Sequence, residues 1–217
     1  MKYNSIIKKI RKYDVVSFDV FDTLIERDVF LSTDIFVKTG NRILGNTLAE
    51  EFSFKRIKAE EKARKKSAFG EITLDEIYNQ LRDYEPEVRK KLKEVELETE
   101  LASCLQKKEV YSIFEWAYKN ALNVIIISDM YLSAVQIDLM LKKCGYDGYK
   151  KIYVSNEYGV NKISGRLFTT VLEDLGISKE KMIHIGDSIK ADFIGARRVG
   201  IDSVLVNRKN RIIRKLC

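Results

Sequence analysis

Carboxylate side chains stand directly after apolar runs at several places in this chain of 217 residues. Asp19, Asp129 and Asp187 each come within two residues of the end of such a run. A carboxylate at the tip of a buried strand is exposed to substrate yet rigidly held, so it can act as a nucleophile. Several carboxylates brought together can also bind a hard divalent cation through oxygen. The elements that carry these residues decide whether they meet.

The second half of the chain alternates apolar runs with stretches of helical spacing. The apolar runs lie at 124–127, 152–154, 182–185 and 203–206. Such alternation is typical of a parallel sheet that helices cover on both faces. Together with the apolar run at 15–18, it predicts an α/β fold with five parallel strands.

Residues from about 28 to 105 have a different pattern, in which charged residues alternate with helically spaced apolar ones. Runs of β-branched residues disappear from this block, which indicates helices. Thr73 followed by Glu76 has the spacing of a capping box, a sign of a helix start. We expect three to five packed helices, inserted after the first strand of the sheet.

Ligands of parallel sheets bind at the carboxyl ends of the strands. In the predicted sheet Asp19, Ser128, Asp129 and Asp187 lie at such ends, and Asp192 lies about one helical turn after Asp187. We therefore expect these carboxylates, with nearby hydroxyl groups, to converge at one edge of the sheet. This set of side chains suits a divalent cation and a phosphoryl group.

The composition is that of a globular protein without a membrane span. Hydrophobic residues make up 45% and charged residues 33% of the chain, and no apolar run approaches the ~20 residues that cross a bilayer. The net charge is +7, with a basic tail at 207–215, but 32 acidic residues are interleaved with 39 basic ones. We expect a solvated surface, small anionic partners and no nucleic acid. The pattern also predicts a cytoplasmic protein with no signal peptide, no disulfides and no zinc site.

Four short motifs resemble those of the haloacid dehalogenase (HAD) superfamily, and they occur in order over nearly the whole chain. They are SFDVFDTL, VIIISD, the lysine of NEYGVNKISGRLF, and IHIGDSIKADFIGA. The fourth is the most specific, because an aspartate after a strand or a single loop lysine is common by itself. The resemblance implies a Rossmann-like HAD core at 1–26 and 106–217, with a C1-type helical cap at 27–105.

The resemblance also implies roles for the matching residues. Asp19 would be the nucleophile that forms an aspartyl-phosphate, Lys162 would neutralise charge, and Ser128 would bind the transferring oxygens. Mg2+ would be held by Asp19, the backbone carbonyl of Phe21, Asp187 and Asp192, the last directly or through water.

Four further residues are candidates for support or substrate contact, namely Thr23, Asp22, Asp129 and Arg27. Thr23 is expected to hydrogen-bond the loop around Asp19, and Arg27 to contact an anionic substrate or to lie at the surface. His184, the sole histidine, invites a general-base role. Because it lies inside a predicted strand two residues before Gly186, we expect a packed, hydrogen-bonded ring instead.

The first motif departs from the phosphatase pattern at two positions. HAD phosphatases usually carry a second aspartate two residues after the nucleophile, where it protonates the leaving group and then activates water. Phe21 stands at that position here, and Asp22 replaces the glycine that follows it in the family. General acid–base help is typically worth ~10² to 10⁴ in rate, so the loss of this aspartate bears directly on function.

Three functions are compatible with this departure. The first is a Mg2+-dependent phosphatase or phosphotransferase for a small phosphorylated metabolite, in which Asp22, a cap residue or the substrate supplies the proton. The second is a 2-haloacid dehalogenase, which lacks the second aspartate and attacks carbon. The third is a binding or interaction module that has lost turnover, with a link to surface-polysaccharide assembly. The retained Asp19, Asp187 and Asp192 favour phosphate over halide, and Lys162 with Ser128 argues against a dead site.

Overall fold

The computed structural model describes residues 2–120 and 122–206, which form two compact units. One unit contains the described residues up to 26 and from 105 onward, and the other contains residues 27–104. Cys104 and Cys144 are buried thiols that are not part of a disulfide within the described residues. The basic tail at 207–215 and Cys217 lie outside the described residues.

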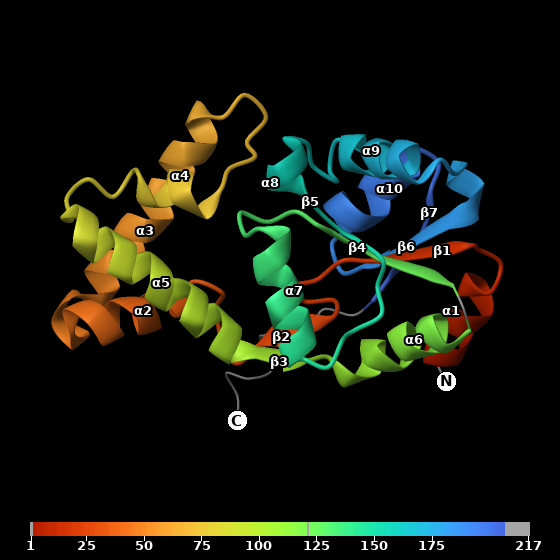
Figure 1. Ribbon diagram of the computed structural model, residues 1–217, viewed down its shortest axis with the longest axis horizontal. Coiled ribbons are helices and arrows are strands. Elements are labelled where there is room, and N and C mark those ends of the chain that lie inside the picture. Colours follow the sequence, from red (N-terminus) through yellow and green to blue (C-terminus); the bar gives the residue numbers. More distant parts are fainter. Residues whose placement is uncertain (1, 121, 207–217) are drawn as a thin grey trace. The chain divides into compact units, whose positions relative to one another are not determined.

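A five-stranded parallel sheet forms the centre of the first unit (Figure 1), which confirms the predicted α/β fold. The strand order is β5-β4-β1-β6-β7, and every neighbouring pair is parallel. The strands are β1 (Val15–Phe18), β4 (Asn123–Ser128), β5 (Ile152–Val154), β6 (Met182–Gly186) and β7 (Asp202–Leu205). The first strand of the chain therefore lies in the middle of the sheet, so that Asp19 follows a strand with neighbours on both sides.

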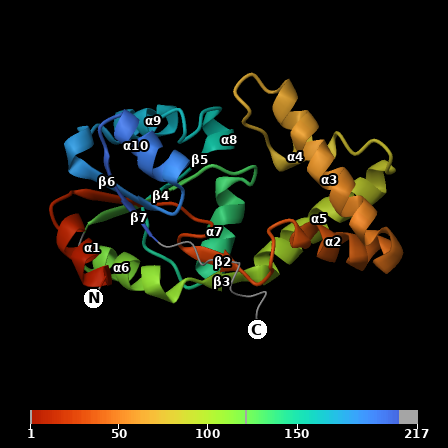
Figure 2. The same cartoon turned by 180° about the vertical axis from the view of Figure 1, so that it is seen from behind.

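Helices cover both faces of this sheet, as the buried central strands require. Helices α1 (Lys2–Ile10) and α6 (Lys108–Lys119) lie on one face, and α9 (Arg166–Leu175) and α10 (Gly195–Arg198) on the other (Figures 1 and 2). Phe114 of α6 packs on Phe18, with ring centroids 5.6 Å apart, and Phe168 of α9 packs on His184 at 4.9 Å. The unit also contains α7 (Ala134–Lys143), α8 (Ser155–Tyr158), the 3-10 helix η1 (Lys179–Lys181) and the π-helix η2 (Ile189–Ile194).

Four helices make up residues 27–104, within the predicted range of three to five. They are α2 (Asp34–Leu44), α3 (Asn46–Lys66), α4 (Leu74–Tyr78) and α5 (Pro86–Ser103). The predicted capping box is confirmed at the start of α4, where the Thr73 hydroxyl accepts from the Glu76 N–H and the Glu76 carboxylate accepts from the Thr73 N–H. The short strands β2 (Ile25–Arg27) and β3 (Cys104–Gln106) pair with each other where the chain leaves the sheet unit and returns.

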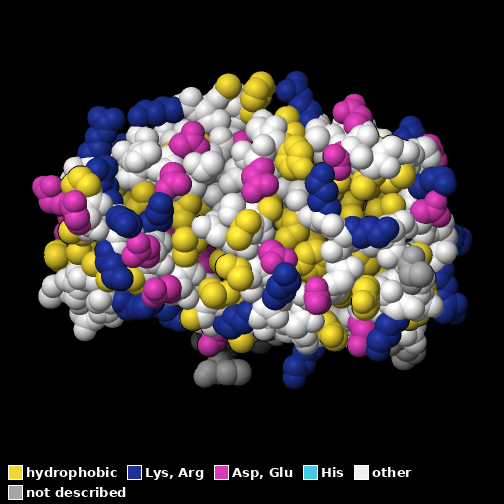
Figure 3. Space-filling model, in the orientation of Figure 1, with side chains coloured by type: hydrophobic (Ala, Val, Ile, Leu, Met, Phe, Trp, Pro, Cys, Tyr) yellow, Lys and Arg dark blue, Asp and Glu magenta, His cyan; other side chains and the backbone are white. Residues whose placement is uncertain are grey.

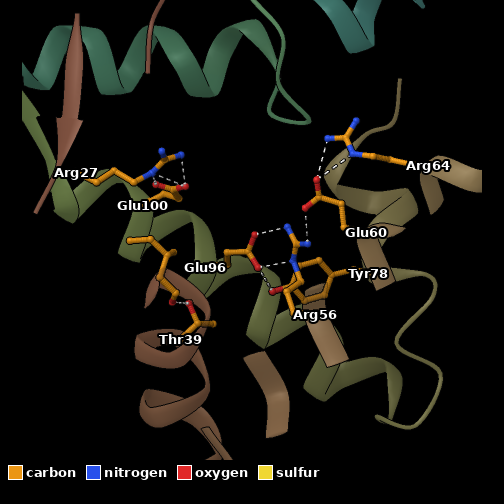
Figure 4. A network of polar contacts seen from close by, with 9 residues as sticks. Arg27, Thr39, Arg56, Glu60, Arg64, Tyr78, Glu96 and Glu100 are labelled. Carbon is orange, nitrogen blue, oxygen red and sulfur yellow. Dashed lines mark hydrogen bonds and ion pairs between the residues drawn. The ribbon is translucent and has the colours of Figure 1, made fainter. Parts of the chain in front are cut away.

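A buried ion-pair network joins α3 to α5 (Figure 4), and no sequence pattern predicted it. The Arg56 guanidinium has no exposed surface and donates to both carboxylate oxygens of Glu96 at 2.8 Å. Tyr78 donates a further hydrogen bond to Glu96 at 2.7 Å, and Arg56 also reaches Glu60 at 3.2 Å. Both buried charges are therefore hydrogen-bonded, which offsets the cost of removing them from water.

The surface of the described part carries charges of both signs. On the face drawn in Figure 3, basic and acidic side chains are interspersed and do not gather into one region of a single sign. Among the helices of the described ranges, none combines the length and apolar character that a membrane span needs.

Candidate active site

Asp19 lies at the carboxyl end of β1 and is held by the neighbouring strand. Its backbone N–H donates to the Ile185 carbonyl of β6 at 2.9 Å, so the ladder between the strands reaches the residue itself. Lys162 Nζ donates to Asp19 Oδ1 at 2.7 Å and to Asp192 Oδ1 at 2.6 Å. Lys162 is 2% exposed and Asp19 is 7% exposed. Residues from three of the four motifs thus meet in one buried cluster.

The loop that carries Lys162 is fixed by Asp129 and by close backbone packing. The Lys162 N–H donates to both carboxylate oxygens of Asp129, at 3.0 and 3.1 Å. At Gly195 a Cβ atom would lie 2.1 Å from the Lys162 carbonyl oxygen, and at Gly186 it would lie 2.2 Å from Asp192 Cγ. Only glycine permits these approaches. Asp129 therefore anchors the backbone of Lys162. Both glycines of the fourth motif are required because any side chain at these positions would clash.

Asp192 accepts hydrogen bonds on both of its oxygens. Oδ1 accepts from Lys162 and from His184 Nε2 at 3.1 Å, and Oδ2 accepts from the Ser188 N–H at 2.8 Å. The residue lies on the π-helix η2, a type of helix that is rare in proteins but is often found at functional sites. Burial raises the pKa of Asp192, but Lys162 and His184 lower it by more, so this pKa lies well below its usual range.

His184 is completely buried in β6, with both ring nitrogens hydrogen-bonded. Nδ1 lies 2.8 Å from Ser17 Oγ, and Nε2 faces Asp192. Because a carboxylate only accepts, Nε2 carries the proton and Nδ1 accepts from the Ser17 hydroxyl. Burial lowers the pKa of His184, which favours the neutral ring. Sequence reasoning did not single out Ser17, whose contact depends on the register of β1 with β6.

Three carboxylates form a group that could hold a metal ion. Asp19, Asp187 and Asp192 each offer an oxygen within 4.8 Å of the others. Thr23 donates to Asp187 Oδ1 at 3.5 Å. Burial raises the pKa of Asp19 to about 7; the Lys162 ammonium opposes this rise, and the carboxylates of Asp192 and Asp187 add to it. A divalent cation would relieve this surplus of negative charge, and an all-oxygen donor set fits Mg2+.

Asp22 adopts a left-handed backbone conformation in the turn after Asp19. Its φ angle is 62°, and its N–H donates to the Ile25 carbonyl at 2.7 Å. Glycine adopts this conformation freely, and aspartate tolerates it better than most other residues do. The replacement of the family glycine by Asp22 is therefore compatible with the turn. Phe21, at the position of the second family aspartate, has no proton to donate.

Lys107 lies beside this turn, and sequence reasoning missed it. The residue is 5% exposed, and its Nζ donates to the Asp22 carbonyl at 2.5 Å. Burial lowers the pKa of Lys107, while the carboxylates of Asp187 and Asp22 raise it. A lysine just before a helix carries no signal in a chain with so many lysines.

Ser128 and Arg27 have different surroundings. Ser128 is 1% exposed, and it follows Ile127, whose carbonyl accepts from Lys162 at 3.3 Å. Arg27 belongs to the helical unit, where it forms a bidentate ion pair with Glu100 at 2.7 and 2.8 Å (Figure 4). Its contact with a substrate stays a prediction.

Comparison with solved structures places the fold among known hydrolases. The HAD-hydrolase YfnB of Bacillus subtilis, bound to magnesium, has a TM-score of 0.62 at 20% identity, covering 92% of this chain and 91% of that one. A HAD phosphatase of Thermococcus onnurineus has a TM-score of 0.64 at 20% identity, covering 91% and 87%. A 2-haloacid dehalogenase of Pseudomonas syringae pv. Tomato has a TM-score of 0.59 at 18% identity, covering 90% and 86%. These likenesses concern the fold.

Comparison of sequences gives the family. Glyceraldehyde 3-phosphate phosphatase of Methanopyrus kandleri is 30% identical over 60 residues. The matched stretch is 28% of this chain and 26% of that protein, about a quarter of the relative's length. The family model of the haloacid dehalogenase-like hydrolases matches residues 13–200, which span both units. The chain therefore belongs to the haloacid dehalogenase-like hydrolase family.

Proposed function

We propose that this hydrolase is a Mg2+-dependent phosphatase or phosphotransferase for a small phosphorylated metabolite. The observation that carries the proposal is the Lys162 ammonium, which bridges Asp19 and Asp192 within a group of three carboxylates. A carboxylate that attacks an anionic phosphate needs added positive charge and metal ligands, whereas displacement of halide from carbon does not. The similarity to a phosphatase over 60 residues supports the same reaction class.

Asp19 is the proposed nucleophile. Its carboxylate attacks phosphorus, and the bond from phosphorus to the leaving oxygen breaks as the bond to Asp19 forms. Water then hydrolyses the aspartyl-phosphate, or an acceptor hydroxyl takes the phosphoryl group. The backbone bond to Ile185 fixes the main chain of Asp19, and Lys162 holds its carboxylate before substrate arrives, so little reorganisation is needed.

The proposed metal ligands are Asp19, Asp187 and the backbone carbonyl of Phe21. Because both oxygens of Asp192 already accept N–H donors, we assign Asp192 a contact through water. Mg2+, when bound, neutralises and orients the phosphoryl oxygens. Lys162 adds a second positive charge, and the Ser128 hydroxyl donates to a transferring oxygen.

Substrate choice is assigned to the helical insertion. We propose that residues 27–105 act as a C1-type cap, and that the enzyme acts on soluble metabolites in the cytoplasm. Because Phe21 cannot protonate the leaving oxygen, the proton comes from Asp22, a cap residue or the substrate. Leaving groups that depart easily as anions should therefore react fastest.

The test is hydrolysis of p-nitrophenyl phosphate, whose leaving group hardly needs an acid. We expect activity that requires Mg2+, disappears in EDTA and falls to background in Asp19→Asn, because the nucleophile is lost. Asp147→Asn, the same change at an exposed residue, should retain wild-type activity.

Other outcomes separate the alternatives. Absence of turnover with every phosphoester and acyl phosphate would contradict phosphoryl transfer. Release of chloride from a 2-haloacid without metal would select the dehalogenase. Binding of inorganic phosphate to the protein without any turnover would select the binding module.

A further inference from the structure

A continuous line of hydrogen bonds runs from the interior of the sheet to the proposed nucleophile. Its successive contacts are Ser17 Oγ to His184 Nδ1 at 2.8 Å, His184 Nε2 to Asp192 Oδ1 at 3.1 Å, Asp192 Oδ1 to Lys162 Nζ at 2.6 Å, and Lys162 Nζ to Asp19 Oδ1 at 2.7 Å. All five residues are at most 7% exposed. Hydrogen bonds in such surroundings are stronger than in water and costly to leave unmade.

The direction of each bond in this line follows from chemistry. Lys162 only donates, so the oxygens of Asp19 and Asp192 that face it accept, and Asp192, whose pKa lies well below its usual range, is an ionised carboxylate that only accepts. His184 must therefore donate from Nε2, which leaves Nδ1 as an acceptor for the Ser17 hydroxyl. Ser17 thus fixes the ring in the tautomer that can hold Asp192, as partners of the far ring nitrogen do in many sites.

Lys162 depends on Asp192 for its position. Its ammonium sits at the end of a flexible chain of four methylene groups, and it needs a fixed partner on each side to stay at one point. Asp19 is one partner and must also meet the substrate. Asp192 is the second charged partner, at 2.6 Å, and the Ile127 carbonyl accepts more weakly at 3.3 Å. The Ser188 N–H holds Oδ2 of Asp192, and for Oδ1 His184 is the only side chain besides Lys162 that is seen to donate within the described ranges.

We propose that His184 is a positioning residue, which fixes Asp192 and through it keeps the Lys162 ammonium on Asp19. Ser17 supports this role by setting the tautomer of the ring. The inference rests on the proposed function for its effect on rate. Its structural part, the placement of Lys162 by His184, is independent of any reaction.

The variants that test the proposal differ in where they place a donor. His184→Gln carries an amide nitrogen near the position of Nε2, whereas His184→Asn carries one near the position of Nδ1. His184→Phe keeps a ring against Phe168 but has no donor at all. Ser203→Ala is the matched control, because Ser203 is the register partner of His184 on β7. Its buried hydroxyl has no hydrogen-bond partner among the described residues.

Kinetics on p-nitrophenyl phosphate with Mg2+ give the first measurement. We expect kcat to fall about 10- to 100-fold in His184→Phe and His184→Asn, the usual effect of losing a partner that orients a site residue. KM and the half-saturating Mg2+ concentration should change little, His184→Gln should recover most of kcat, and Ser203→Ala should match wild type. The proposal would be overturned if His184→Gln and His184→Asn lost kcat equally and the losses paralleled their losses of thermal stability. It would also be overturned by a loss that saturating Mg2+ restores.

Two further measurements need no turnover. With a single histidine, 15N-histidine NMR reads the tautomer directly, and we expect the proton on Nε2. A crystal structure of His184→Phe should show Lys162 Nζ displaced from Asp19 in an unchanged sheet. A proton on Nδ1, or Lys162 still on Asp19 in that variant, would refute the positioning role. If wild type hydrolyses no phosphoester, the proposed function fails, and these two results still decide this proposal.

Discussion

Phe21 separates this site from the phosphatase pattern of its family at the scale of a single residue. If the missing acid limits the reaction, Phe21→Asp should raise the rate on alkyl phosphates by ~10² or more, because it supplies a proton to a poor leaving group. The rate on p-nitrophenyl phosphate should change far less. Phe21→Asn is the control, since its amide has a similar size but no acidic proton. Equal rates in the two variants on a panel of alkyl phosphates would show that the acid is not limiting.

Lys107 holds the turn that contains Phe21, through the Asp22 carbonyl. Lys107→Met removes the hydrogen bond that the charged Lys107 ammonium donates to the Asp22 carbonyl. Such a bond contributes about 1.5–3 kcal/mol, so the free energy of unfolding should fall by a similar amount. Hydrolysis of p-nitrophenyl phosphate should fall with it, because the carbonyl of Phe21, a proposed metal ligand, would no longer be held in place. Lys107→Arg keeps a cationic donor and should lose less of both. Urea unfolding and the phosphatase assay measure the two effects, and a fully stable, fully active Met variant would contradict this role.

The helices of the insertion are joined by the Arg56–Glu96 ion pair, so its effect belongs to the scale of elements. Arg56→Met leaves the buried Glu96 charge without its bidentate partner and should cost about 3–5 kcal/mol of unfolding free energy. Lys58→Met, which breaks an exposed pair with Glu61 on the same helix, should cost about 0–1 kcal/mol. Urea denaturation of each variant measures its loss of unfolding free energy, and amide hydrogen exchange over residues 27–104 shows whether the loss lies in the helical unit. Similar losses in the two variants would mean that the buried pair contributes no more than a surface pair.

The main elements were predictable because their patterns are strong. The five strands are apolar runs, and the central ones are buried on both faces, so each run shows in the sequence. The strands β2 and β3 were not predicted, since each has three residues and β2 includes Glu26 and Arg27. The π-helix η2 was not predicted either, because the spacing of apolar residues does not distinguish a short π-helix from an α-helix.

The placement of candidate site residues was predictable where it follows from position after a strand. Asp19, Ser128 and Asp187 follow apolar runs and could be proposed from that position, whereas Lys162 was proposed only through its motif. The contacts of Ser17 with His184 and of Lys107 with Asp22 could not be predicted. They join residues 167 and 85 positions apart, so they depend on strand register and backbone course, not on spacing.

The pH dependence of stability concerns the whole molecule, in metal-free protein. His184 has a pKa below its usual 6.5, so as pH falls below 6.5 the unfolded chain takes up a proton that the folded chain does not. This lowers the free energy of unfolding by up to about 1.4 kcal/mol per pH unit, until the folded pKa is reached. Asp19, with its pKa raised to about 7, gives the opposite slope, because the folded state binds its proton first.

Comparison of wild type with His184→Gln in EDTA isolates the histidine contribution. As pH falls from about 7 to about 5, the free energy of unfolding of the variant should rise relative to that of wild type, as measured by urea unfolding at each pH. A difference between the two proteins that does not vary over this range would contradict a lowered pKa for His184.

The central place of β1 has a consequence for synthesis on the ribosome. Val15 pairs with Asn123 of β4 on one side and with Met182 of β6 on the other. Strand β1 is therefore synthesised before either of the strands that it pairs with. All four helices of the insertion, by contrast, are complete once residue 103 has been added. The insertion can therefore fold while β1 still exposes its hydrogen-bonding edges. A chain released before residue 182 would keep one edge of β1 open to other molecules, so aggregation of prematurely terminated chains should depend on which side of this residue they end.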